Sequence, residues 1–170
     1  MKTKHYLTLA DAEFLLNTAH AYAAEQGFNV SIAVVDETGN LLAMKRMDGA
    51  SPMTANLCLE KAKCSAISKR PSKLFEDLIR NGQQGFLTVE SISGMLEGGE
   101  PILYQGQLVG AVGISGVKSF QDAEIAQFVR KQFEQKGMKV LTDAVVQSIQ
   151  IENGQVHCVV ETANDVQTLV

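Results

Sequence analysis

Two runs of sequence decide the fold of this chain: Gly98-Gly99-Glu100-Pro101-Ile102 and Leu108-Val109-Gly110-Ala111-Val112-Gly113-Ile114-Ser115-Gly116. Together they predict a β-hairpin, with strands over residues 102–104 and 107–115 and a turn at Gln105-Gly106. The second strand is apolar at nearly every position, so we expect both of its faces to be covered by other elements.

Glycine recurs at every third position of the second strand, at Gly110, Gly113 and Gly116. Glycine packs no side chain inside a strand, and it usually marks a bulge or a close approach to the backbone. The approaching group is either a helix, which is the commoner case, or a ligand. The spacing is not the dinucleotide-binding fingerprint, because these glycines lie largely within a strand rather than at a strand-to-helix turn.

The composition is that of an ordinary globular domain: 170 residues, 45% hydrophobic, 20% charged, with a net charge of −4. No basic face dominates, which argues against nucleic acid as a partner. The N-terminus lacks the apolar core of a secretory signal, and no apolar run approaches a membrane span. We therefore expect a cytoplasmic protein with reduced cysteines and no membrane partner. The cysteine and histidine spacing does not predict a zinc site.

Working outward from the hairpin, the periodicity and capping signals predict four helices and four further strands. Thr8 with Asp11, and Ser119 with Asp122, are the expected helix starts, and Asn153-Gly154 is a strong hairpin turn. The segment over residues 83–100 mixes glycine, serine and apolar residues, as binding loops often do. The expected helices are residues 8–26, 51–68, 72–81 and 119–136, and the strands 30–36, 41–46, 145–151 and 155–160.

Few polar residues are candidates for a functional site. His20 falls at the edge of the apolar stripe of the first helix, where a boundary residue is commoner than a metal ligand. A group of cations lies at and beyond the C-terminal half of the second helix, either as a solvated face near a helix C-terminus or as a carboxylate site. These cations are Lys61, Lys63, Lys69, Arg70 and Lys73. Taken alone, the residues indicate an α/β domain with an antiparallel sheet and a glycine-lined patch.

Five motifs in series, over about residues 5–133, resemble the GlcG/HbpS family in order and spacing. They are Val30-Ser31-Ile32-Ala33-Val34-Val35-Asp36 with Gly39, then Arg46-Met47-Asp48-Gly49-Ala50, then Lys61-Ala62, then Gly98-Gly99-Glu100-Pro101-Ile102, and last Gly110–Gly116 with Gln121-Asp122. The resemblance implies an α/β (α+β) fold: an antiparallel five-stranded sheet with packed helices, similar to profilin. It also implies a PduO-like, small-ligand-binding and most often haem-binding protein that forms homo-oligomers. Genes of the family often neighbour small-diol or glycolate catabolism, which implies an accessory role there.

If haem binds, its iron needs an axial donor and its propionates favour cations. His20 is the expected donor, since His5 lies in a terminal arm and His157 in the tail. The family motifs carry Arg46 and Lys61 as the expected cations. Four motif glycines would let a flat ligand approach the backbone: Gly98, Gly99, Gly110 and Gly113. The alternative is an enzyme acting on a small oxygenated metabolite, with Arg46, Asp48 and Glu97 in the pocket.

The tail departs from that family, and residues 122–170 are instead similar to a fragment of dihydrolipoamide-dehydrogenase-type flavoproteins. It carries none of their cofactor-binding glycines and no redox cysteine pair, so we infer neither FAD nor NAD from it. We expect a family-like domain over residues 1–136 and a C-terminal β-hairpin extension over residues 137–170.

Overall fold

The computed structural model describes residues 3–135, 145–152, 155–161 and 166–169. The chain divides into two compact units, Met1–Lys136 and Gly137–Val170. Among the described residues, no helix combines the length and the apolar composition needed to cross a membrane.

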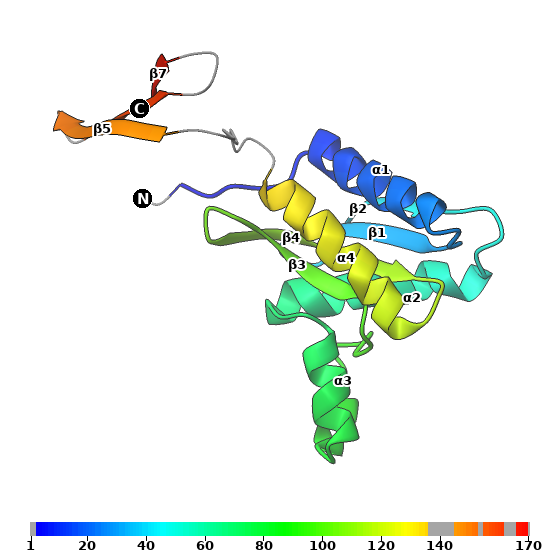
Figure 1. Ribbon diagram of the computed structural model, residues 1–170. Coiled ribbons are helices and arrows are strands. Elements are labelled where there is room, and N and C mark those ends of the chain that lie inside the picture. The colour runs from blue at the N-terminus through cyan, green and yellow to red at the C-terminus, as the bar shows by residue number, and fades with distance from the viewer. Residues whose placement is uncertain (1–2, 136–144, 153–154, 162–165, 170) are drawn as a thin grey trace. The chain divides into compact units, whose positions relative to one another are not determined.

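The first unit is built on one antiparallel sheet with strand order β2-β1-β4-β3 (Figure 1). Helices α1 and α4 pack on one face of this sheet, and α2 packs on the other. The elements are α1 (Leu9–Glu25), β1 (Ser31–Asp36), β2 (Leu41–Arg46), α2 (Pro52–Ser68), α3 (Lys73–Arg80), the short 3-10 helix η1 (Gln84–Thr88), β3 (Gly99–Tyr104), β4 (Gln107–Ser115) and α4 (Ser119–Glu134).

The capping signals explain where α1 begins and correct the expected start of α4. Thr8 caps α1 as expected, and its hydroxyl accepts the backbone N–H of Asp11. At α4 the N-cap is Lys118, whose backbone N–H donates to the side chain of Gln121. The expected capping carboxylate, Asp122, is instead buried in the domain interior, where a basic partner from α2 holds it.

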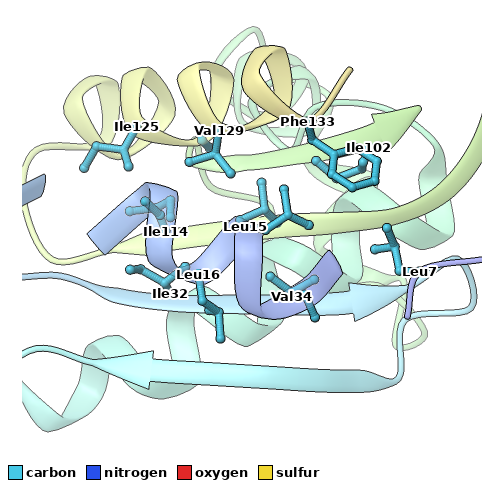
Figure 2. Close-up of a cluster of buried hydrophobic side chains, with 14 of the residues drawn as sticks. Leu7, Leu15, Leu16, Ile32, Val34, Ile102, Ile114, Ile125, Val129 and Phe133 are labelled. Atoms are coloured by element: carbon cyan, nitrogen blue, oxygen red, sulfur yellow. The ribbon is translucent and has the colours of Figure 1, made fainter. Parts of the chain in front are cut away.

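The face covered by α1 and α4 is filled with large aliphatic side chains (Figure 2). Residues alternate between the two faces of a strand, so β1 and β4 each send every second side chain to this layer. Ile32 and Val34 of β1 meet Leu15 of α1, and Ile114 of β4 lies close by. The α4 side is completed by Ile125, Val129 and Phe133.

The opposite face, under α2, is lined by small residues. Its buried cluster consists of Ala33, Val35, Cys58, Ala62, Ala66 and Ala111. Such residues let a helix backbone lie close to a sheet backbone. The expectation that β4 is covered on both faces is therefore confirmed, since its residues from Val109 to Ser115 are buried.

The second unit is a three-stranded antiparallel sheet of order β5-β6-β7, made of β5 (Val145–Glu152), β6 (Gln155–Glu161) and β7 (Val166–Leu169). The predicted hairpin is confirmed as β5 and β6, although its Asn153-Gly154 turn lies outside the described residues. The α/β class is also confirmed, with one correction. The described main sheet has four strands rather than five, and the tail strands form their own sheet.

Candidate functional site

His20 lies on the outer surface of α1 and is exposed to solvent. In the described part of the chain, no hydrogen bond, ion pair or ring contact engages its imidazole. The exposed helix neighbours of His20 are short: Asn17, Ala21 and Ala24. An imidazole that is free of partners and flanked by short side chains is accessible to a ligand from outside.

The same flank of α1 carries a basic group that the sequence did not single out. Lys45 of β2 donates a hydrogen bond from Nζ to Oδ1 of Asn17, at 2.5 Å. Asn17 precedes His20 by three positions, so the two side chains are neighbours on the helix surface. Tyr22 lies on the other flank, where it contacts Glu124 and Phe128 of α4.

Arg46, one of the two expected cations, belongs to the other side of the sheet. Partners across an antiparallel pair share a face, and successive residues alternate. Lys45 pairs with Ile32 of the aliphatic layer, whereas Arg46 pairs with Ser31, whose hydroxyl is hydrogen-bonded to Thr54 of α2. Arg46 is exposed at the end of β2 and on the α2 side. The structure therefore does not bring Arg46 and His20 together.

Lys61, the second expected cation, is buried and forms an ion pair inside the protein. Its ammonium lies 2.8 Å from the carboxylate of Asp122 and donates to the carbonyl oxygen of Ile114 at 3.0 Å. Both charged side chains are only 3% exposed. Burial raises the pKa of Asp122, and the neighbouring Lys61 opposes that rise. This buried pair ties α2 to α4 and to the end of β4, and it offers no free charge to a ligand.

The four motif glycines are enclosed by the protein itself. A Cβ on Gly113 would lie 2.0 Å from the carbonyl oxygen of Cys58. One on Gly99 would lie 2.2 Å from that of Lys61, so both glycines make room for α2. The sequence left open whether a helix or a ligand approaches the backbone here, and in the structure the approaching group is α2.

The other two glycines are enclosed in the same way. A Cβ on Gly98 would meet the Lys61 ammonium at 2.9 Å. One on Gly110 would meet the Val35 carbonyl oxygen at 2.4 Å and a methyl group of Leu7 at 2.5 Å. These contacts show that protein atoms occupy the space where a side chain on either glycine would lie.

A cavity of about 560 Å³ lies between α3, η1 and the segment that follows η1, and most of its lining belongs to residues 83–100, the stretch expected to be a binding loop. Seven of its lining residues are apolar, four are polar, and one is a glycine. The apolar set is Ile79, Phe86, Leu87, Val89, Ile92, Met95 and Leu96, the polar set is Glu76, Arg80, Glu90 and Ser93, and the glycine is Gly94. Its size and apolar lining are those of a small-molecule pocket.

The polar side chains of this cavity have partners both within and outside its lining, since Ser93 donates a hydrogen bond to Glu60. The carboxylate of Glu76 accepts hydrogen bonds from Arg80 and from the backbone N–H of Glu97. Arg46, Asp48 and Glu97, the expected residues of a metabolite enzyme, do not line the cavity. The described residues contain no cluster of three or more metal-ligand side chains.

Among haem-donor residue types, the cavity offers one side chain, the thioether of Met95. Cys58 and Cys64, which are both buried, are poor candidates. Burial raises the pKa of Cys58 to about 12 and that of Cys64 to about 11, so neither offers a thiolate at neutral pH. The outer flank of α1 at His20 and the cavity beside α3 are thus two places in the described chain that are accessible to a ligand.

Sequence reasoning selected His20 but missed Lys45 and the make-up of the cavity. Strand alternation already separates Lys45 from Arg46, because neighbours in a strand point to opposite faces. Which face lies under α1 depends on the pairing of β2 with β1, and no local pattern supplies it.

The fold and these two places define a small α/β ligand-binding domain. Residues 7–131 match the family described as "Haem degrading protein HbpS-like", and the chain belongs to this family.

Individual relatives agree with this assignment. The chain is 39% identical to Protein GlcG of Escherichia coli K12 over 115 residues, which covers 68% of this chain and 85% of that protein. Klebsiella pneumoniae protein ORFY is similar in structure, with a TM-score of 0.72 at 29% identity, over 78% of this chain and 94% of that one. A structure titled as a PduOC–heme complex gives a TM-score of 0.67 at 25% identity, over 75% and 94% of the two chains.

Proposed function

We propose that this protein binds haem on the outer flank of α1, with His20 as the axial donor to the iron. The observation that carries the proposal is the free, exposed imidazole of His20. Neutral imidazole is a common haem ligand, and it needs an accessible nitrogen. The haem complex of a structural relative supports the choice of ligand.

The residues around His20 fit a flat, amphipathic group. Ala21 and Ala24 have short side chains beside the imidazole, and the side chain of Asn17 is hydrogen-bonded to Lys45. Haem itself would supply the iron chemistry. The chain supplies a ligand nitrogen, short side chains for the face of the macrocycle, and a cation on the same flank.

An open surface of this kind covers one side of a flat ligand and leaves the other side to solvent. A second copy of the chain, placed over the free side, would exclude that water. We therefore include homo-oligomerisation in the proposal, as the sequence analysis expects. Light scattering of the protein with and without haemin tests it, and a mass near 18.4 kDa in both samples would contradict it.

The binding test is a haemin titration of the purified full-length protein, followed by absorbance at the Soret band. The wild type is expected to give saturable binding, and His20→Ala is expected to shift the spectrum and weaken binding at least tenfold. Because His20 is exposed, this substitution should leave the melting temperature nearly unchanged. Circular dichroism of the variant checks that the fold is intact.

Met95→Leu is the matched control for the cavity beside α3, since leucine keeps the apolar volume and removes the sulfur. We expect Met95→Leu to bind haemin like the wild type. A loss of binding in Met95→Leu, with His20→Ala unaffected, would move the site to the cavity. No saturable binding to the wild type would overturn the proposal as a whole.

A further inference from the structure

We propose that Lys45 recognises a carboxylate of the ligand that His20 binds, which makes it the cation of the site in place of Arg46 and Lys61. This inference rests on the proposed function and adds to it a specific contact. For haem the carboxylate is a propionate, which extends from the edge of the macrocycle.

The position of Lys45 follows from two independent observations. Its strand register places it opposite Ile32, on the face that α1 covers. Its ammonium reaches the helix itself, where it donates to Asn17, one turn before His20. Residues three apart on a helix have Cβ atoms about 5–6 Å apart. The charge therefore lies on the same flank of α1 as His20, one helical turn before it.

The ammonium of Lys45 has bonding capacity left for a ligand. A lysine ammonium carries three N–H donors, and the contact to Asn17 uses one. Asn17 is a neutral acceptor, so in the described structure no carboxylate is bonded to this charge. A ligand carboxylate would make a charge-assisted hydrogen bond, which is stronger than the bond to an amide oxygen.

The other cations near the family motifs are excluded by position. Arg46 is next to Lys45 in sequence but faces the α2 side of the sheet, with Ser31 as its cross-strand partner. Lys61 is buried and paired with Asp122. Arg46 is therefore a matched control for Lys45, because it carries the same charge one residue away but lies on the opposite face of the sheet.

The test compares haemin with its dimethyl ester, in which both carboxylates are blocked, in titrations of four proteins. These are the wild type, Lys45→Met, Lys45→Arg and Arg46→Met. Methionine keeps the aliphatic stem and removes the charge. Lys45→Met is expected to weaken haemin binding about five- to tenfold, as for a partly exposed charged contact. It is expected to leave the affinity for the diester unchanged.

Lys45→Arg is expected to restore most of the haemin affinity, and Arg46→Met is expected to match the wild type. Raising the salt concentration should reduce the difference between wild type and Lys45→Met, because exposed charge contacts are screened.

Three results would overturn this inference: equal weakening by Lys45→Met and Arg46→Met, equal weakening of haemin and diester by Lys45→Met, or no effect of Lys45→Met at all. Haemin binding that depends on His20 but not on Lys45 would remove this inference alone. If the wild type does not bind haemin, both this inference and the proposed function are overturned.

Discussion

The two faces of the main sheet are packed by opposite means. The face under α1 and α4 is filled by long aliphatic side chains such as Leu15, Ile32 and Ile114. The face under α2 is made of alanines, a valine, a cysteine and glycines, and a Cβ at Gly113 would meet a carbonyl oxygen of α2 at 2.0 Å. On the first face side chains separate the layers, and on the second the backbones nearly touch.

The difference shows where this domain tolerates change. Aliphatic side chains have alternative rotamers and can repack, whereas a backbone contact has nothing to rearrange. Helix α2 also supplies Lys61 to the buried pair with Asp122 of α4, and a buried charge must keep its partner. We expect substitutions on the α2 side to have the larger effects, and three predictions test this from the largest effect to the smallest.

Lys61→Met is expected to lower the free energy of unfolding by about 3–5 kcal/mol, because it leaves the Asp122 carboxylate buried without its cation. Urea denaturation measures the change. Adding Asp122→Asn should recover part of the loss, since the asparagine side chain is neutral. Lys73→Met is the exposed control: its partner Asp77 is 45% exposed, and the cost should stay below about 1 kcal/mol. Equal costs for the two lysines would contradict the prediction.

Gly113→Ala is expected to destabilise the domain by about 1–3 kcal/mol or more, because α2 must move to admit one methyl group. The control is Gly85→Ala, since a Cβ at Gly85 has no atom within 4 Å. That substitution should change the melting temperature little, or raise it slightly by restricting the unfolded chain. If thermal unfolding shows both variants to be equally stable, the close approach of α2 is not tight in solution.

Glu100 gives the smallest expected effect, seen in the pH dependence of stability. Burial raises the pKa of Glu100, although Arg130 lies 2.8 Å away and opposes the shift. A carboxyl with a raised folded-state pKa binds its proton more tightly in the folded protein, so its contribution to stability falls as pH rises from the ordinary carboxyl range through the raised pKa.

Glu100→Gln removes this contribution and should change the free energy of unfolding at neutral pH by no more than about 1 kcal/mol, because Arg130 is partly exposed and still has Glu134 nearby. Carboxyls such as Asp36 and Glu60 have lowered pKa values and act in the opposite sense, so the informative quantity is the difference between variant and wild type at each pH. We expect the stability of Glu100→Gln relative to the wild type to increase as pH rises from 4 to 7. A difference that does not vary with pH would show that Glu100 titrates normally.

The sequence by itself determined the elements and much of their order. Thr8 and Asp11 set the start of α1, alternation and apolar runs set β1 and β4, and serial family motifs set the fold class. These signals are local, since capping bonds and strand alternation involve residues only a few positions apart. For the same reason His20 was recognisable as a residue at the edge of an apolar stripe.

Only the tertiary structure decided which polar residues meet. Lys61 and Asp122 are 61 positions apart, and Lys45 and Asn17 are 28 apart. Whether Lys61 binds a ligand or forms a buried ion pair depends on the packing of α2 against α4. Whether Lys45 or Arg46 lies beside His20 depends on the register of β2 against β1. Both are long-range pairings, and burial and strand register fix them only when the whole sheet has formed.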